Sequence, residues 1–390
     1  MNFEMYVPTR LLFGSGKLGE LARYPMPGRK AVIVTSDGKS VFQNGAYDRT
    51  VEQLKRAGVD SVCFNRVQAN PLRRTVMDGA AFARENGCDF VVALGGGSVM
   101  DAAKAMAFMA ANPGDVWDYI VGGTGKGMPM RHRPLPVVCI TTTAGTGSEA
   151  DQWGVISHGE RNEKIGFGGW DELFPVLSVI DPELTESVPP EFTAYQGFDA
   201  LFHSTECYIS AGANWMSDMY AETAIQNVAR YLPRAVQDGN DLEAREHVSF
   251  GNTLSGVAMT LCSTTAEHSI EHAMSAFHPG LPHGAGLIMI SRAFYEFFIE
   301  RHACDGRFVR MARLMGMETA ERPEDFLTAL TELQRACGVD QLKMSDYGFM
   351  PEEFDALAAN ARETMGGLFS ANPCELPDEA CAEILRRSYR

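Results

Sequence analysis

Residues 89–104 read DFVVALGGGSVMDAAK, and this stretch decides the fold of the first half of the chain. It opens with a continuous apolar run, which is typical of a strand buried on both faces of a parallel sheet. Gly95, Gly96, Gly97 and Ser98 follow, and a helical pattern begins directly after them. Glycines let a backbone approach a ligand closely, and free amides at a helix start can hold a pyrophosphate. The stretch therefore predicts a strand, a tight loop and a helix that suit a nucleotide.

A second loop of small residues, TTTAGTGSE at 141–149, follows the next apolar run. Ligands of open α/β sheets bind beyond the carboxyl ends of the strands, so two such loops indicate one nucleotide that spans both. A tight strand-to-helix turn without any ligand is the alternative reading of the glycine string alone. The GxGxxG fingerprint is absent, and the common Rossmann arrangement is therefore not expected.

Outward from this stretch, short apolar runs alternate with helical spacing. The runs lie at 31–35, 60–64, 89–96, 136–141 and 175–181, and the helical stretches at 46–57, 72–86 and 99–111. This βαβ alternation predicts an open, doubly wound and mostly parallel sheet, Rossmann-like in its layers.

The pattern changes at the proline pair 189–190, after which no further strand is expected. The later amphipathic or buried stretches read as helices, for example at 219–236, 284–300, 323–337 and 378–387. A chain of 390 residues also exceeds the usual size of a single core. We therefore expect an α/β dinucleotide-binding domain over residues 1–185 and an all-helical metal-binding domain over residues 186–390.

Composition narrows the functional classes. Hydrophobic residues make up 45% and charged residues 22%, as in an ordinary globular protein, and the net charge is −16. This acidity argues against nucleic acid or an anionic membrane as the main partner, and no apolar run is long enough to cross a bilayer. The nine scattered cysteines and an amino terminus without a signal pattern predict a cytoplasmic protein with reduced thiols.

Four of the nine histidines fall in one segment, HSIEHAMSAFHPGLPHG. His268 and His272 are four residues apart and share a helix face, as do Asp199 and His203 in GFDALFHSTE. Each histidine alone is more typical of a hydrogen-bonded core residue than of a ligand. Two such pairs, with His283 in a Pro-His-Gly turn, offer enough nitrogen and carboxylate donors for a four-ligand site. That mixture suits zinc or ferrous iron.

Asp37 lies two residues beyond the first apolar run of the sheet. A carboxylate at this place can accept hydrogen bonds from the 2′-hydroxyl of an adenosine ribose and repels a 2′-phosphate. The string SDGK is also an ordinary turn, in which Asp is favoured for local hydrogen bonding. The first reading predicts NAD(H) in preference to NADP(H).

Five motifs match one family in the right order. GGGSVMDAAK, TTTAGTGSE, IDPELTESVPP, GFDALFHSTECY and HSIEHAMSAFHPGLPHGAGL resemble those of the iron-dependent, or group III, alcohol dehydrogenases. The resemblance runs from FGSG at 13–16 to the last helix. It implies the dehydroquinate-synthase-like architecture of an amino-terminal dinucleotide-binding domain, a helical carboxyl-terminal domain and an active site between them.

The resemblance also assigns residues. It implies that the metal ligands are Asp199, His203, His268 and His283. His278 is expected to be a loop residue or a residue that contacts a ligand. On the cofactor side the resemblance adds to Asp37, proposed above from its position, the residues Gly95, Gly96, Gly97, Ser98, Asp101, Thr141, Thr142, Thr146, Ser148 and Lys164. For Lys164 a plain solvated lysine is the alternative.

The implied activity is that of an NAD(P)-dependent alcohol dehydrogenase or aldehyde reductase. Its substrate would be a small alcohol or aldehyde, its metal Fe²⁺ with Zn²⁺ as the alternative, and its assembly a homodimer or higher homo-oligomer. Within the superfamily a glycerol- or other polyol-type dehydrogenase is the alternative. Outside it, a metal-dependent hydrolase or lyase and a binding protein with a structural metal stay open. Glu267 and Glu271 stand in the wrong register for the base of an HExxH motif.

His272 shares a helix face with His268 but lies one turn further along. We expect it near the substrate oxygen, where an imidazole with a pKa near neutrality could carry the proton released by alcohol oxidation. The alternative is a histidine that only orients its neighbours by hydrogen bonding.

Overall fold

The computed structural model describes residues 3–390 and divides them into two compact units. The α/β unit comprises Tyr6–Arg161 and Ile165–Ser187. The helical unit comprises Val188–Arg390 together with residues 3–5 and Asn162–Lys164.

A six-stranded parallel sheet forms the centre of the α/β unit, in the order β1-β8-β5-β4-β2-β3. Its strands are β1 (Arg10–Phe13), β2 (Lys30–Ser36), β3 (Asp60–Val67), β4 (Phe90–Gly95), β5 (Val137–Thr141) and β8 (Leu177–Ile180). β4 lies between β2 and β5 and is buried along its whole length, which explains its continuous apolar sequence.

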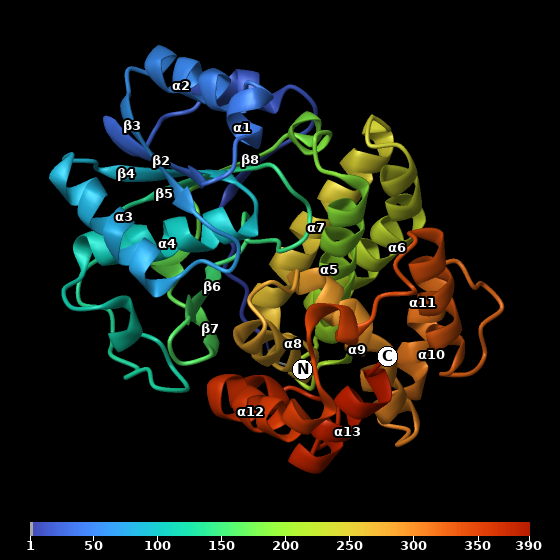
Figure 1. The fold of residues 1–390 in the computed structure, drawn as a ribbon. Coiled ribbons are helices and arrows are strands. Elements are labelled where there is room, and N and C mark those ends of the chain that lie inside the picture. Colours follow the sequence, from blue (N-terminus) through green and yellow to red (C-terminus); the bar gives the residue numbers. More distant parts are fainter. Residues whose placement is uncertain (1–2) are drawn as a thin grey trace. The chain divides into compact units, whose positions relative to one another are not determined.

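Helices cover both faces of this sheet (Figure 1). α1 (Ser40–Gln43) and α2 (Ala46–Arg56) lie on one face, and α3 (Arg73–Glu85) and α4 (Gly97–Ala111) on the other. On the α2 side, alternate strand residues such as Ile33, Val92 and Ile140 pack with Leu54 in one apolar core. The expected doubly wound α/β fold is confirmed.

The β6 strand (Trp153–His158) and the β7 strand (Glu163–Gly168) form a separate two-stranded sheet. Neither strand was expected, and neither was β1. β6 and β7 are short and mix polar with apolar residues, so they do not give the continuous apolar signal on which the other strands were predicted. They form a β6–β7 hairpin whose turn, at residues 159–162, leads directly to Lys164.

Among the residues described, the helical unit contains the strand residues Glu163 and Lys164, at the start of β7. Its helices are α5 (Pro190–Ile209), α6 (Trp215–Gln237), α7 (Leu242–Leu261), α8 (Ala266–Phe277), α9 (His283–Ile299), α10 (Asp305–Leu314), α11 (Asp325–Ala336), α12 (Phe354–Ser370) and α13 (Asp378–Ser388). Over residues 3–390, no helix combines the length and the apolar character that a membrane span requires.

Aromatic side chains make the core of the helical unit. Tyr295 of α9 packs edge-on against Phe308 and Phe326, and tilted against Phe202 of α5. α8 packs beside α9 and α12 and is buried at nearly every position, including its polar ones. A helix with buried histidines and glutamates must satisfy them internally, and this requirement creates the site described next.

Candidate metal centre and nucleotide loops

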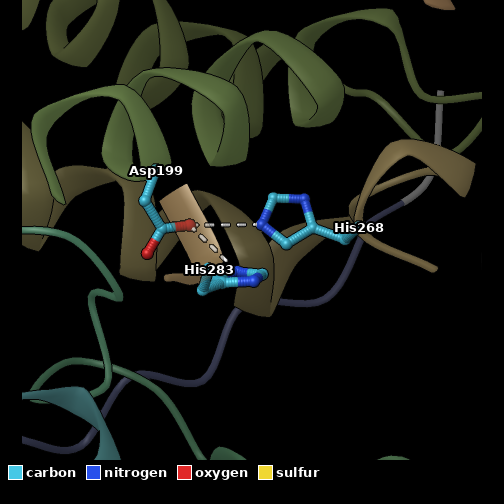
Figure 2. A group of neighbouring side chains, drawn as sticks. All are labelled: Asp199, His268 and His283. Atoms are coloured by element: carbon cyan, nitrogen blue, oxygen red, sulfur yellow. Dashed lines mark hydrogen bonds and ion pairs between the residues drawn. The ribbon is translucent and has the colours of Figure 1, made fainter. Parts of the chain in front are cut away.

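Asp199, His268 and His283 converge on one point inside the helical unit (Figure 2). Asp199 comes from α5, His268 from α8 and His283 from the first position of α9. The Nε2 atoms of both histidines lie 3.4 Å from Oδ1 of Asp199. One possible ligand atom from each residue lies within 4.8 Å of the others. The sequence-predicted cluster is therefore assembled in space from three different helices.

A glycine allows this approach. A Cβ atom on Gly284 would stand 2.1 Å from the carbonyl oxygen of Tyr195 on α5. Real Cβ atoms do not approach a backbone so closely, so only glycine lets the start of α9 pack against α5 here. The contact lies one helical turn before Asp199, and it brings His283 within reach of that carboxylate.

His203, the fourth predicted ligand, lies beside the cluster. Its ring stacks on His268 with centroids 4.3 Å apart, and its Nδ1 is 3.6 Å from Oδ1 of Asp199. It is buried, like Asp199 one turn before it. The structure thus brings all four predicted ligands together, three of them with their ligand atoms directed at one another.

Two glutamates that the sequence reading did not assign stand behind the histidines. Nδ1 of His268 is hydrogen-bonded to Glu206, and Nδ1 of His283 to Glu271. A carboxylate bound to Nδ1 fixes the tautomer in which Nε2 is free to bind a metal. Glu206 follows Asp199 and His203 at helical spacing on the same face of α5, and this pattern could have revealed it.

The charges in the cluster shift its pKa values. Burial lowers the pKa of His268, but the carboxylates of Glu206 and Asp199 outweigh it and raise the pKa to about 10. Burial also lowers the pKa of His283, but the carboxylates of Glu271 and Asp199 outweigh this effect, and the pKa is raised. Burial would raise the pKa of Asp199, yet the imidazoles of His203 and His283 hold it well below its usual range. The carboxylates thus favour positive charge at His268 and His283, and a bound cation would supply such charge.

These residues fit a divalent metal. One carboxylate and three imidazoles are the donors that zinc or ferrous iron accepts, and the Nε2 atoms of two of the imidazoles already face the carboxylate. Both of these histidines have the hydrogen-bonded Nδ1 that metal-binding histidines nearly always show. A closed structural zinc site would normally be richer in cysteine.

His272 lies at the rim of the Asp199 cluster, where it forms a second group with Glu271 and His283 whose possible ligand atoms lie within 4.8 Å of one another. Its ring centroid is 6.3 Å from that of His268 and 5.4 Å from that of His283, and its Nδ1 contacts Sδ of Met365 on α12 at 2.8 Å. Burial, followed by the charges of Lys164 and the neighbouring histidines, lowers the pKa of His272 well below its usual value. The imidazole is thus neutral in this environment, and its part in proton transfer stays a prediction.

Lys164 is not a solvated lysine. Its side chain is 5% exposed, and its Nζ lies 3.2 Å from Oε2 of Glu271, 2.8 Å from Oγ of Ser275 and 3.3 Å from Nδ1 of His283. The family resemblance implied a cofactor-binding lysine, whereas the contacts of the described structure are with the metal cluster.

In the α/β unit, the predicted nucleotide residues share one edge of the sheet. β5, β4 and β2 are adjacent and parallel, so Thr141, Gly95 and the exposed Asp37 follow neighbouring strand ends. The chain runs from β2 outward to β3 and returns to β4 on the other side of β2. The strand order therefore reverses between β2 and β4, which is where open α/β sheets bind their ligands.

The two small-residue loops pack tightly against each other. A Cβ on Gly97 would stand 2.1 Å from Cγ2 of Thr146, and a Cβ on Gly96 would stand 2.8 Å from Oγ1 of Thr143. The amide of Thr142 donates to the carbonyl of Gly95 at 3.1 Å. The N-cap residue of α4 is Gly96, which has no side chain to cap the helix, and the amides of Val99 and Met100 both donate to its carbonyl. The amides of Gly97 and Ser98, which come before them, are the ones that suit a ligand. This cradle fits the phosphates of a dinucleotide.

Asp101 and Ser148 lie in a buried network behind this cradle. Ser148 Oγ donates to Oδ1 of Asp101 at 2.8 Å and accepts from Nζ of Lys104 at 2.8 Å. Lys104 is fully buried and also donates to Asp151, at 2.8 Å, and to the carbonyl of Trp153, at 2.7 Å. Burial raises the pKa of Asp101 to about 6. The network ties α4 to the second loop and to β6, so these residues set the loop's position.

The remaining predicted residues have simpler contacts. Oγ1 of Thr141 donates to the carbonyl of Thr143 at 2.9 Å, and Oγ1 of Thr146 accepts from the amide of Ser148 at 3.3 Å. His278, expected in a loop, ends α8 and contacts Glu353 through Nε2 at 2.9 Å.

Models of two protein families match the chain. One is described as iron-containing alcohol dehydrogenase and matches residues 8–182. The other is the carboxyl-terminal domain of the Fe-containing alcohol dehydrogenase family and matches residues 193–389.

Individual relatives match over nearly the whole chain. A choline dehydrogenase of Bacillus subtilis is 34% identical over 92% of this chain and 88% of its own length. A 1,3-propanediol dehydrogenase of Klebsiella pneumoniae is 32% identical and covers 99% of both. Among solved structures, an archaeal halo-thermophilic alcohol dehydrogenase from a Red Sea brine pool has a TM-score of 0.93 and 33% identity, covering 100% of this chain and 99% of that one.

Proposed function

The chain belongs to the iron-containing alcohol dehydrogenase family, and on this premise we propose that it interconverts a small primary alcohol and its aldehyde. It is a metal-dependent, nicotinamide-linked oxidoreductase that acts on CH–OH groups. The observation that carries the proposal is the convergence of Asp199, His268 and His283, with both Nε2 atoms facing the carboxylate. Asp199, His203, His268 and His283 would hold the metal.

Each bound group supplies its own chemistry. A divalent metal, when bound, acts as a Lewis acid toward an alcohol or aldehyde oxygen. The nicotinamide, when bound, accepts or supplies the hydride. The chain's own contribution is to position these groups. Glu206 and Glu271 keep the Nδ1 protons of two ligand histidines in place, and the buried faces of α8 and α9 exclude water.

His272 is proposed to handle the substrate proton. Its Nδ1 faces Met365, so its Nε2 is the nitrogen available to accept a proton from a hydroxyl group. His272 is neutral in its buried environment, as an acceptor must be. The alternative remains a histidine that only orients its neighbours.

We propose NAD(H) as the cofactor, with its phosphates on Gly95, Gly96, Gly97 and Ser98 and its adenosine ribose at Asp37. Two observations support this. The helix α4 begins after a glycine N-cap, and the exposed Asp37 follows β2, one of the two strands between which the strand order reverses. Relatives named NAD-dependent methanol dehydrogenase and NADH-dependent butanol dehydrogenase favour the same choice. The loops with Thr141, Thr142, Thr146 and Ser148 would line the cofactor, with Asp101 behind them.

Iron(II) is the proposed native metal, because the matching family is described as iron-containing. Zinc binds nitrogen-rich sites more tightly than iron in the Irving–Williams order, so a purified sample is expected to carry either ion. Growth in iron-supplied medium, followed by anaerobic purification and elemental analysis, tests the choice.

The substrate class follows from the relatives' names, which include dehydrogenases of 1,3-propanediol, methanol, butanol and choline. All of these substrates carry a primary hydroxyl group, and we propose the same for this chain. The hydrolase or lyase alternative needs a free carboxylate base near the metal. Glu206 and Glu271 are both bound to histidine nitrogens, which argues against it.

We also propose a cytoplasmic homo-oligomer. All nine cysteines are free thiols, in keeping with a reducing compartment. β1 forms one edge of the six-stranded sheet and exposes Leu11, and an exposed edge can pair with a second copy. Size-exclusion chromatography with light-scattering detection would give the mass of the assembly.

The direct test of the function is a panel of short alcohols, diols and aldehydes, assayed by NADH absorbance. Metal content is determined on the same sample. We expect reduction of aldehydes with NADH and oxidation of primary alcohols with NAD⁺. No turnover with any carbonyl compound, at full metal and nucleotide occupancy, would contradict the proposal.

A further inference from the structure

Glu271 and Lys164 form a buried ion pair that touches one metal-ligand histidine and not the other. The Glu271 side chain is fully buried, and its Oε2 accepts from Nζ of Lys164 at 3.2 Å while it also binds Nδ1 of His283. Its Oε1 accepts from Oγ of Ser275 at 2.9 Å. Every described contact of this carboxylate group therefore goes to a cation, a hydroxyl or the metal-ligand imidazole.

The other histidine is anchored differently. Glu206, behind His268, accepts from the amide and from the hydroxyl of Thr265 at 2.7 Å each, at the start of α8. These donors are neutral, whereas the donor behind Glu271 is an ammonium. His268 and His283 are thus each bound to a glutamate, but the two glutamates are held by different kinds of donor.

We propose that Lys164 and Glu271 are positioning residues of the metal centre, acting together on His283. Glu271 keeps the proton on Nδ1 of His283 and leaves Nε2 directed at Asp199, and Lys164 fixes Glu271 and balances its charge. This inference rests on the proposed metal-binding function of the cluster. It assigns Lys164 to the metal centre, although the family resemblance implied a cofactor role.

The chain's own geometry explains how Lys164 reaches this place. It is the second residue of β7, directly after the turn of the β6–β7 hairpin, and belongs with the helical unit. Gly286 provides the space for its partner, because a Cβ there would stand 2.8 Å from Cγ of Glu271. A buried lysine so close to a cation site is costly unless a carboxylate lies between them, and Glu271 is that carboxylate.

This arrangement predicts non-additive effects on metal affinity. Glu271→Gln removes the charge that orients His283 and leaves the Lys164 ammonium unpaired beside the metal. Metal affinity should fall by about 10–100-fold. Adding Lys164→Met to Glu271→Gln removes the unpaired ammonium, so the double variant should bind metal more tightly than Glu271→Gln alone. Lys164→Met alone should affect metal affinity less than Glu271→Gln and should leave NADH affinity unchanged.

The measurements are chelator competition with Zn²⁺ or Co²⁺, the visible spectrum of the Co²⁺ form, and NADH titration by fluorescence. None of these requires turnover, so failure of this proposal is distinct from failure of the proposed activity. Glu267→Gln is the matched control, because Glu267 is equally buried on α8 and lies one residue from His268. Arg161→Met controls for loss of a positive charge at the exposed hairpin turn.

Three results would overturn the proposal. The first is that Glu271→Gln binds metal as tightly as Glu267→Gln. The second is that the double variant binds metal no more tightly than Glu271→Gln. The third is that Lys164→Met binds NADH weakly while its metal affinity is unchanged. If Glu271→Gln does not fold, Glu271→Asp takes its place. The shorter side chain keeps the negative charge but draws its carboxylate back from both His283 and Lys164, which contact the same oxygen of Glu271. Its metal affinity must also fall and its Co²⁺ spectrum must change, and an unchanged variant would equally overturn the proposal.

Discussion

The metal cluster of the helical unit and the nucleotide loops of the α/β unit are built on opposite principles. In the helical unit, the proposed metal ligands are carboxylate and imidazole side chains, and the carboxylates of Glu206 and Glu271 are hydrogen-bonded to two of the imidazoles. In the α/β unit, backbone amides and small residues form the cradle, and the charged residues Asp101, Lys104 and Asp151 are buried behind it.

The difference determines how each site fails. A metal cluster depends on particular donor atoms and charges, so loss of one imidazole removes a large share of the affinity. A backbone cradle depends on spacing, so an added methyl group does more harm there than a lost side chain. Variants in the two units should therefore separate metal binding from nucleotide binding.

The largest effect is expected for His268→Ala or His203→Ala. Each variant should lose metal and have no measurable turnover, while NADH binds with nearly normal affinity because the cradle lies in the other unit. Elemental analysis, the NADH assay and nucleotide titration check this. Full metal occupancy in both variants would show that the ligand assignment is wrong.

Next in size is His272→Ala, which should keep its metal and its nucleotide affinity but lose about a hundredfold in kcat. The reason is loss of the proposed acceptor for the substrate proton, at the rim of the cluster. Metal content and kcat are measured on one sample. Near-normal kcat, or depleted metal, would rule out the proton-transfer role.

Gly97→Ala should have the opposite effect to the His268 and His203 variants, because it should weaken NADH binding and leave metal binding intact. The added Cβ would overlap Thr146, so the loops must separate, and NADH affinity should fall by about tenfold or more. Metal content should be unchanged. Gly19→Ala in the same unit is the control, because no atom lies within 4 Å of a Cβ placed there. Equal NADH affinity of the two variants would contradict the cradle.

Metal affinity should also depend on pH. The pKa of His268 is raised to about 10, so its imidazole holds a proton that a metal must displace, and the raised pKa of His283 acts in the same direction. Affinity should therefore rise with pH, by about tenfold per unit for each displaced proton. Chelator competition at about pH 6 and pH 8 tests the sign. Affinity that is equal at both values would contradict the proton competition.

The smallest effect is expected for Asp37→Gly. Removing an exposed carboxylate that faces a 2′-phosphate is worth about 1 kcal/mol, so kcat/KM with NADPH should rise about fivefold. Use of NADH should fall slightly. If NADPH is already the better cofactor of the unaltered enzyme, Asp37 does not face the ribose.

The features that could be predicted from the sequence are those that produce a regular hydrophobic or helical spacing. The buried strand β4 gave a continuous apolar signal, and the pairs Asp199 with His203 and His268 with His272 gave helical spacing, so the doubly wound sheet and the cluster could be foreseen. The β6 and β7 strands could not, because they are short, half polar and outside the six-stranded sheet.

The contacts of Glu271 with His283 and with Lys164 could not be predicted from the sequence either. Glu271 binds a histidine twelve residues away in the next helix, and Lys164 reaches it across 107 residues of chain. Neither pairing follows a helical or strand period, because packing between elements alone creates it. Glu206 is the exception, since its spacing from Asp199 and His203 was visible in the sequence.

We infer that a metal in the helical unit is needed for turnover but not for nucleotide binding. The most direct test is to strip the protein with a chelator, measure NADH affinity, and then add Fe²⁺ anaerobically while aldehyde reduction is followed by NADH absorbance. We predict normal NADH affinity and no turnover in the stripped protein, and recovery of turnover as one ion per chain is bound. Full turnover in the metal-free protein would contradict the account.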